Sequence, residues 1–393
     1  MPKKISNFFI SNMFECHNYR CICQKDIEYQ IPGQPAETTL KMYCDPNEPL
    51  LFAYAPQKGL NLSGVAGAAL ESNILGKLLK IPDGDIDAHI AFFEKYGFLL
   101  PLESDEYVSV KADDVMNLVY HIKSTLRLMN AIAGERDYKA MLIHATYLLF
   151  SSPVSIDYSG GQYETCRHRF TDLIGTCCNF PDMNGNQEAF DTGKFTVSDT
   201  MCGSGTVDLS FYNAVRSSSN TTVNGSADSH FKNIVALYTS YPHEDSDLRT
   251  IIDFYYHFQL ERGVLKDIRY RHISFYSKNE SFVLSEEMKS ALLKISRLVI
   301  SEEINHNIAG IHPKYNSGEL SPEWQLNNLL EAIYFSIFYM KPSVEIYREC
   351  ENPSCKRDVY FLVNATATNK KYCCAECANA AAQRRYRSKK MQK

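Results

Sequence analysis

The sequence predicts an α+β protein with a mainly helical N-terminal region, a loop- and strand-rich middle region and a small, separate C-terminal module. Three observations support this fold class. Apolar residues recur at helical spacing within the first 150 residues. The stretch 151–227 is rich in Gly, Ser, Asn, Thr and Asp, which is typical of loops and short strands. Five of the 13 cysteines gather at 350–377, close to many basic residues.

The length and composition indicate a globular protein of several domains. A chain of 393 residues with 45% hydrophobic and 22% charged residues is long for a single core. We expect an α-rich region, a loop- and strand-rich region, a helical region and a compact C-terminal module, at 1–150, 151–280, 281–343 and 345–393. The third region is expected to end in a hinge at 341–343, because Pro342 cannot continue a helix.

The N-terminal region is predicted to begin irregularly and then to form helices. Residues 1–60 hold only short apolar runs separated by turn residues. Four helices are expected before residue 150, at 67–79, 85–98, 112–133 and 136–150. The clearest is 112–133, whose apolar residues fall at the spacing of one buried face. Gly134 is expected to end it.

Short strands and then two more helices are predicted after residue 190. The segments KFTVS and TVDLSFY are rich in β-branched and aromatic residues, so we expect strands there. One helix is predicted at 285–303. Another is predicted at 322–339, because Ser321 suits an N-cap and Pro322 suits the first helical turn.

The cysteines near the C-terminus have the spacing of a metal site. Cys350-x4-Cys355 is one pair, and 17 residues later follows Cys373-x3-Cys377 or Cys374-x2-Cys377. Between the pairs, VYFLV is expected to be a strand and KKYC to return as its partner. The Ala-rich stretch after Cys377 favours a helix. A cysteine pair, a hairpin and a helix that starts at the second pair predict a treble-clef-like zinc finger.

We expect one structural Zn²⁺ in this module, held by four thiolates. The predicted ligands are Cys350, Cys355, Cys373 and Cys377, with Cys374 left open as the alternative to Cys373. About 45 residues offer few large apolar groups, so metal binding would supply the missing stability. Four cysteine ligands leave no coordination position for water, which argues against catalysis. The alternative is five free thiols in a small apolar core.

Positive charge is concentrated in the same module. Residues 341–393 hold 12 basic and 5 acidic residues, a net charge of +7, whereas the rest of the chain carries −12. A basic helix beside a zinc site suits contact with nucleic-acid phosphates. The candidate contact residues are Lys370, Lys371, Arg384, Arg385, Arg387, Lys389 and Lys390. The alternative is a solvated helix end whose charge complements its own dipole.

The C-terminal segment resembles the finger of the bacterial CGNR zinc-finger family, over about 45 residues. Tyr372-Cys373 matches the family's aromatic-Cys step, and Arg384-Arg385-Tyr386-Arg387 matches its basic helix. The tetrad Cys-Gly-Asn-Arg stands here as CANA, at 377–380, so its Gly and Arg are both Ala. The resemblance implies a transcription-regulator-like protein with a helical sensor-like region before a finger that binds DNA.

Two other groups of residues were weighed as sites. A second metal site is one interpretation of the N-terminal group formed by Cys16, His17, Cys21, Cys23 and Cys44, and reduced core thiols are the other. Cys166 near His168 suggests a Cys–His nucleophile, but nothing in the sequence orients the pair. Phosphate-binding, dinucleotide-binding and hydrolase motifs are absent from the sequence, so we do not expect an enzyme.

The first hypothesis is therefore a cytoplasmic bacterial DNA-binding protein. We expect no signal peptide. The sequence holds no run of about 18 apolar residues, so we expect no membrane span. A single finger binds weakly, so a homodimer is one expected route to affinity, and a small ligand for the N-terminal region is left open. One competing hypothesis is a protein-interaction or structural module in which zinc only stabilises the tail. Another is an enzyme whose site carries no recognised motif.

Overall fold

The computed structural model divides the chain into two compact units. Unit 1 comprises Met1–Gly134, Val154–Thr165 and Ile304–Lys393, and unit 2 comprises Glu135–Pro153 and Cys166–Glu303. Both units are discontinuous in sequence. The structure describes residues 13–28, 37–56, 58–64, 69–104, 107–133, 135–158, 160–177, 195–199, 201, 203–207, 234, 237–238, 244–263, 265–269, 272–275, 283–318, 320–340, 345–355, 360–364, 366–367 and 369–391. The expected hinge at 341–343 lies outside this part of the chain.

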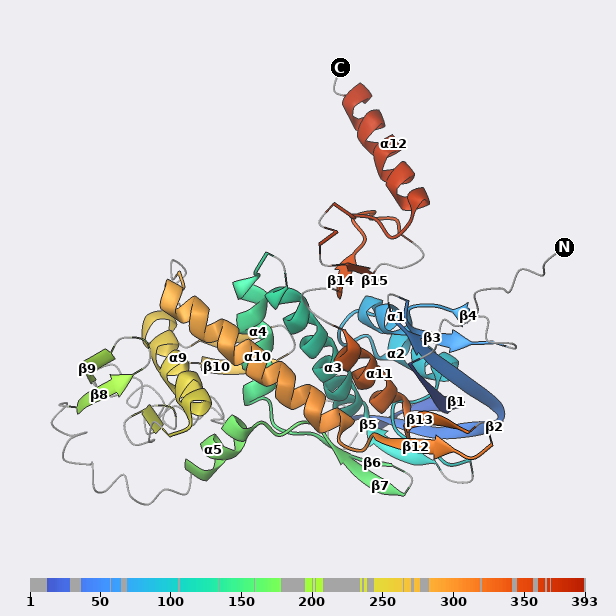
Figure 1. Cartoon of the computed structure of the whole chain (residues 1–393), viewed down its shortest axis with the longest axis horizontal. Helices are drawn as coiled ribbons and strands as arrows, with labels where there is room; N and C mark the ends of the chain where they lie inside the picture. The colour runs from blue at the N-terminus through green and yellow to red at the C-terminus, as the bar shows by residue number, and fades with distance from the viewer. Residues whose placement is uncertain are drawn as a thin grey trace. The chain divides into compact units, whose positions relative to one another are not determined.

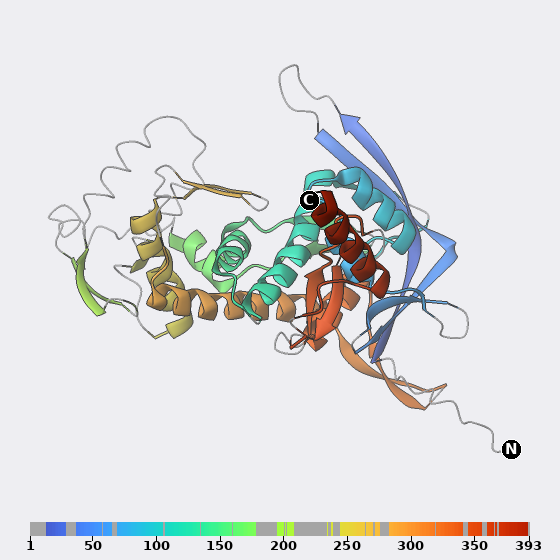
Figure 2. The same cartoon turned by 90° about the horizontal axis from the view of Figure 1, so that it is seen from above.

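A five-stranded antiparallel sheet forms the frame of unit 1. Its strands are β1 (Phe14–Glu28), β2 (Glu37–Ala55), β3 (Gly59–Ser63), β4 (Ala69–Glu71) and β5 (Val108–Lys111). β1 pairs along the whole of β2, whose other edge pairs with β5 near its start and with β3 near its end. The two long strands make the extended ribbon in Figure 2.

The expectation of irregular structure at 1–60 is wrong over most of that range. In β1, Phe14 and Cys16 are buried whereas Glu15 and His17 are exposed, so one face of the strand packs into the core. This alternation is the period of a half-buried strand, but cysteine and asparagine obscure it in the sequence. The N-terminal region thus combines a sheet with helices.

Four helices pack with this sheet in unit 1. They are α1 (Ile74–Lys80), α2 (Ile86–Tyr96), α3 (Ala112–Ile132) and α11 (Leu329–Tyr339). The helices expected at 85–98 and 112–133 are confirmed as α2 and α3. The one expected at 67–79 is shorter, because β4 occupies its first residues and Asn73 caps α1 by accepting a bond from the Gly76 N–H at 3.0 Å.

The predicted start of the last apolar helix at Ser321 is wrong. Residues Ser321–Gln325 form β13, which pairs with β12 (His312–Asn316), and Pro322 lies opposite Tyr315. α11 begins at Leu329, where the side chain of Asn328 accepts a bond from the Glu331 N–H at 2.8 Å. Proline is compatible with a two-stranded ribbon as well as with a helix start, so the sequence pattern was ambiguous.

The described residues of unit 2 form helices and two short hairpins. Its helices are α4 (Tyr138–Phe150), α5 (Arg169–Cys177), α9 (Ser246–Arg262) and α10 (Glu286–Ile308), whose last residues belong to unit 1. Its hairpins are β8 (Phe195–Asp199) with β9 (Gly203–Val207) and β10 (Leu265–Arg269) with β11 (His272–Phe275). The expected strand KFTVS is confirmed as β8. Phe150 packs edge-on against Phe170 and Tyr255, which joins α4, α5 and α9 in one core.

Candidate metal centre

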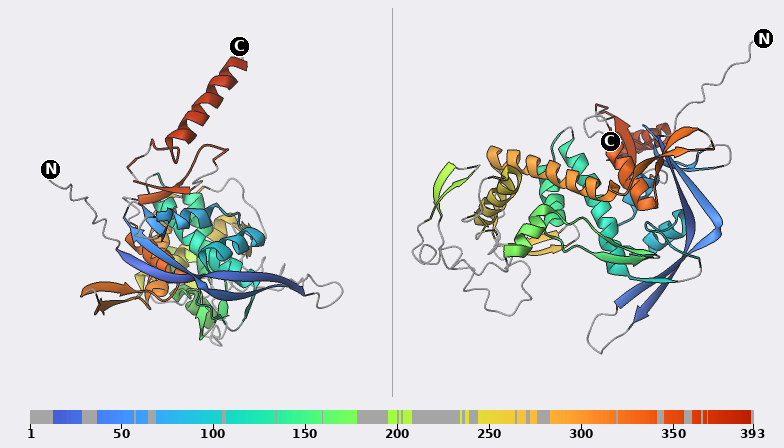
Figure 3. Two further views of the ribbon diagram at one scale, coloured as in Figure 1. Left: turned by 90° about the vertical axis from the view of Figure 1, so that its right-hand side faces the viewer. Right: turned by 60° about the horizontal axis from the view of Figure 1, so that its bottom comes forward.

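Three elements of unit 1 surround the C-terminal cysteines. β14 (Glu345–Glu349) pairs antiparallel with β15 (Tyr360–Asn364), and α12 (Ala375–Met391) follows. Cys350 comes directly after β14, and Cys377 lies in the first turn of α12. Two views show α12 extending away from the β14–β15 hairpin (Figures 1 and 3).

Four sulfur atoms meet where these elements join. The Sγ atoms of Cys350, Cys355, Cys373 and Cys377 all lie within 4.8 Å of one another. The Sγ atoms of Cys355, Cys373 and Cys377 are separated by 3.6 Å in each pair. A tetrahedron of thiolates about 2.3 Å from zinc has edges of about 3.8 Å, whereas a disulfide is only about 2.05 Å long. The four cysteines therefore have the arrangement of a metal site.

Hydrogen bonds around the sulfur atoms fix this arrangement. The Asn352 side-chain N–H donates to Cys377 Sγ at 3.1 Å, and the Cys355 N–H donates to the Asn352 carbonyl at 2.9 Å. Burial, and the hydrogen bonds that the Cys373 thiol donates to Cys374 and Cys377, raise the pKa of Cys373. Four thiolates held together in this way need a cation among them, because each opposes the ionisation of the others.

The second strand of the predicted finger is elsewhere than expected. KKYC does not form a strand, and the partner of β15 is β14, which precedes the first cysteine. The expected strand VYFLV and the expected helix after the second pair are confirmed as β15 and α12. The first cysteine pair therefore lies within the connection between the hairpin strands. The quartet contains Cys373, whereas Cys374 is outside it, with its Sγ 3.7 Å from Cys373 Sγ.

Arg384, one of the predicted nucleic-acid residues, is hydrogen-bonded to the segment between Cys350 and Cys355. Arg384 donates to Ser354 Oγ at 3.2 Å and also to the side-chain oxygen of Asn352. It is seven residues after Cys377, about two helical turns, and so lies on the same face of α12. Its guanidinium is thereby joined to the residue that holds a ligand sulfur, which gives Arg384 a structural role.

The other basic residues of the prediction make different contacts. Lys371 forms an ion pair with Glu351 at 3.1 Å, and Lys370 lies over the ring of Phe361. Arg385 and Arg387 are exposed on α12. The side chains of Lys389 and Lys390 lie outside the described part of the chain. The structure thus gathers the predicted cysteines at one point, whereas the described basic side chains have no common contact.

The β14–β15 hairpin is bonded to the rest of unit 1. Asn130 of α3 donates to the Tyr347 carbonyl at 2.8 Å and accepts from the Tyr347 N–H at 3.1 Å. Asn73 at the start of α1 donates to the Tyr360 carbonyl at 2.6 Å. A Cβ at Gly76 would lie 2.5 Å from the same carbonyl, so this contact requires glycine. The hairpin is therefore part of a larger core, which sequence spacing did not reveal.

The N-terminal cysteines do not gather as the C-terminal ones do. Cys21 lies opposite Cys44 in the β1–β2 register, and Cys16, Cys21, Cys23 and Cys44 are buried. His17 is exposed. Among the described residues, none of these belongs to a group with metal-ligand geometry. The interpretation as core thiols agrees with this placement.

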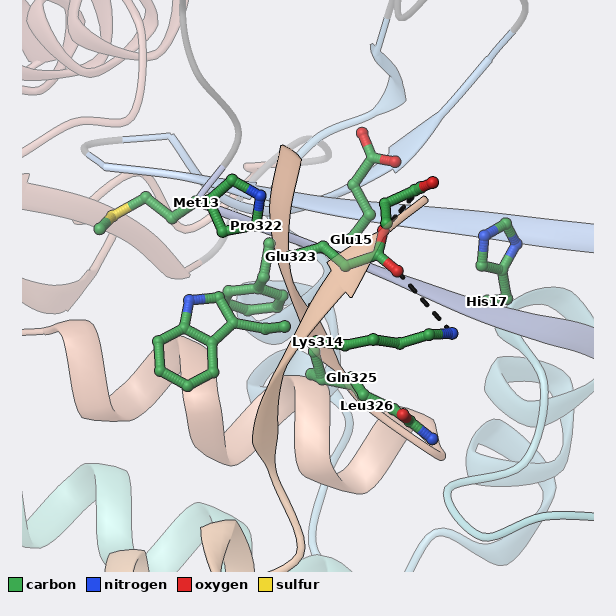
Figure 4. A pocket seen from close by; sticks show the side chains of 11 residues that line it. Met13, Glu15, His17, Lys314, Pro322, Glu323, Gln325 and Leu326 are labelled. Carbon is green, nitrogen blue, oxygen red and sulfur yellow. Dashed lines mark hydrogen bonds and ion pairs between the residues drawn. The ribbon is translucent and has the colours of Figure 1, made fainter. Parts of the chain in front are cut away.

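A pocket of about 630 Å³ lies in unit 1 beside the start of β1. Figure 4 shows Glu15 and His17 of β1 on one wall, and Lys314 and Glu323 of the β12–β13 hairpin on another. A pocket of this size is typical of small-molecule sites. The small ligand for the N-terminal region stays a prediction, and this pocket has the volume for one.

The chain matches no protein-family model, no curated protein and no solved structure. The resemblance of the C-terminal segment to the CGNR finger thus depends on its own motif residues. Among the described helices, none is both long enough and apolar enough to cross a membrane.

Proposed function

We propose that residues 345–393 bind one structural Zn²⁺ through Cys350, Cys355, Cys373 and Cys377, and that the exposed part of α12 contacts DNA phosphates. The protein would then act as a cytoplasmic, transcription-regulator-like protein of the bacterial type. The observation that carries the proposal is the four-sulfur cluster at the base of a basic, largely exposed helix.

The donor set supports zinc as the metal. Tetrahedral sites made of four sulfurs take zinc or iron, and a closed Cys₄ site is typical of structural zinc. The ten cysteines whose side chains the structure describes are free of disulfides, which is compatible with a reducing compartment. A metal would also stabilise a segment whose own core is small, as Cys350, Phe361, Val363 and Cys377 form its buried cluster.

The exposure of α12 supports contact with a charged partner. Cys377 and Ala381 are the buried residues of its described side chains, so one narrow face packs and the rest is solvated. Tyr386 is 70% exposed and lies between Arg385 and Arg387. An exposed arginine pair with an aromatic residue suits phosphate contact and stacking against a base or sugar.

A second function is supported by a different set of contacts. Arg384 and Lys371 bind groups of their own segment, and the β14–β15 hairpin is hydrogen-bonded to α1 and α3. These contacts favour a structural or protein-interaction module in which the metal only stabilises the tail. The two functions differ in whether duplex DNA binds with a strong dependence on salt.

DNA binding can be measured with random duplex at several salt concentrations. If Lys370, Arg385, Arg387, Lys389 and Lys390 each neutralise a phosphate, the log–log slope of affinity against salt should be about −4.5. Replacing both Arg385 and Arg387 by Ala should make the slope less steep by about 2. A matched control is Arg20→Ala with Arg136→Ala, two arginines that are exposed outside α12.

Two results would overturn the DNA proposal. One is the absence of binding at low salt. The other is equal binding by the α12 variant and its control. Either result, obtained with intact metal content, would favour the structural module instead.

The metal is tested separately by elemental analysis of the purified full chain. Cys373→Ser combined with Cys377→Ser should lose one equivalent of zinc relative to wild type, whereas Cys374→Ser should keep it. Loss of zinc in the Cys374→Ser variant would identify Cys374 as a ligand. Iron in place of zinc would retain the site but overturn the metal assignment.

A further inference from the structure

A second group of metal-ligand side chains belongs to unit 2, whereas the C-terminal cysteines belong to unit 1. Cys166 and His168 precede α5, and Glu303 lies on α10. One ligand atom from each of the three side chains lies within 4.8 Å of the others, and all three residues are buried. The sequence brought Cys166 and His168 together, but only the tertiary structure adds the glutamate.

The distances suit ligands that share one ion. His168 Nε2 lies 3.2 Å from Glu303 Oε1. Two ligand atoms about 2.1 Å from a tetrahedral zinc are about 3.4 Å apart, so the pair needs little adjustment. Sulfur, imidazole nitrogen and carboxylate oxygen are all ligands that zinc accepts.

The other side of the imidazole ring is built as a metal-ligating histidine requires. His168 Nδ1 lies 2.8 Å from Glu302 Oε2, and Arg169 Nε donates to Glu302 Oε1 at 2.8 Å. Arg169 is also 3.1 Å from Asp245. Ligating histidines almost always donate their second ring N–H to a carboxylate or carbonyl, which fixes the ring and its tautomer. Glu302 occupies that position, and Arg169 orients it.

We propose that Cys166, His168 Nε2 and Glu303 bind a second Zn²⁺, with Glu302 as the positioning carboxylate. Three protein ligands leave a fourth position for a water molecule, unlike the closed Cys₄ site. This site is independent of the proposed DNA contact, because its residues belong to unit 2 and those of the finger to unit 1.

A metal-free ion network is the competing account of the same geometry. Burial lowers the pKa of His168, but hydrogen bonds to Glu302 and Glu303 outweigh it and raise the pKa to about 9. A protonated imidazole could therefore join the two carboxylates without metal. That account gives Cys166 no function, because the two ion pairs of His168 are made with Glu302 and Glu303 and do not involve the thiol.

Metal content distinguishes the two accounts. The full chain purified after expression with zinc should hold two equivalents, one of which remains in the Cys373→Ser, Cys377→Ser variant. Cys166→Ser should lose the other equivalent and keep the finger's metal. A single equivalent in wild type, lost with the finger cysteines and unaffected by Cys166→Ser, would overturn the proposal.

Absorption spectroscopy of the cobalt-substituted wild type tests the site without a substitution, so the result does not depend on whether a variant folds. Thiolate-to-cobalt charge-transfer bands grow with the number of thiolate ligands, four in the finger and one in the proposed site. Two cobalt populations, the second with weaker charge transfer, are expected. One population with the spectrum of four thiolates would refute the second site.

The role of Glu302 gives a graded test. Glu302→Gln in the Cys373→Ser, Cys377→Ser background should weaken zinc binding about 10- to 100-fold, measured by chelator competition. Glu287→Gln, at an exposed position on the same helix, is the control and should not change the affinity. A purely structural Glu302 would leave zinc affinity equal in the two variants, and that result would also count against the site.

Discussion

The buried histidine of unit 1 makes stability depend on pH in a direction that the structure fixes. His89 is 1% exposed, and its Nδ1 donates to the Asp85 carbonyl at 2.6 Å. Its Nε2 lies 3.2 Å from the ammonium of Lys123, which is also 1% exposed. Because an ammonium group can only donate, Nε2 of the neutral ring accepts this hydrogen bond. Protonation of Nε2 would remove this bond and place two buried cations in contact.

The magnitude follows from the shift in the pKa of His89. Burial first, and the charge of Lys123 second, lower that pKa from 6.5 to about 4. The unfolded chain therefore binds more protons than the native state between these values, so stability falls as the pH falls. Between about pH 7 and about pH 5 the expected loss is about 2 kcal/mol, and it approaches about 3 kcal/mol below pH 4.

Urea unfolding of wild type and His89→Gln at the two pH values measures this effect. Glutamine can accept a hydrogen bond from Lys123 but does not titrate, so the variant should lose about 2 kcal/mol less than wild type on acidification. His312→Gln, at an exposed position on β12, is the matched control and should behave like wild type. Equal pH dependence in wild type and His89→Gln would refute the argument that a neutral His89 accepts from Lys123.

Four substitutions test other features of unit 1. Asn130→Ala removes both hydrogen bonds to the Tyr347 backbone and should destabilise the β14–β15 hairpin by about 2–3 kcal/mol, seen as faster amide exchange in β14. Gly97→Ala should lower the free energy of unfolding in urea by more than about 1 kcal/mol, because φ is 83° and the added Cβ would clash with the Tyr19 carbonyl of β1. Asn328→Ala should cost about 1 kcal/mol in thermal unfolding, whereas Pro322→Ala should change it by less than about 0.5.

Each of these expectations has a contrary result. Unchanged exchange in the Asn130 variant would mean that the hairpin is held by other contacts. A Gly97 variant as stable as wild type would contradict the close approach to β1. A larger loss from Pro322→Ala than from Asn328→Ala would restore the helix start that the sequence suggested.

Local patterns in the sequence were sufficient to predict elements whose structure depends on residues that are close in the chain. The apolar spacing in 112–133 and 85–98 gave α3 and α2, since a helix is determined by neighbours within one or two turns. The strand β1 was missed because its buried face carries Phe14, Cys16 and Cys21, and its pairing with β2 is not local. Strand pairing across many residues is decided by the fold as a whole.

The same distinction applies to the two candidate metal sites. Cysteine spacing predicted the four-sulfur group except for the choice between Cys373 and Cys374, because two pairs of thiols close in sequence need only one loop to meet; the structure places Cys373 in the group. Only the tertiary structure placed Glu302 and Glu303 beside His168, more than 130 positions away in the chain, and turned Arg384 toward Asn352. Contacts of that kind depend on which faces of distant helices and loops pack together, and no short-range pattern of residues encodes them.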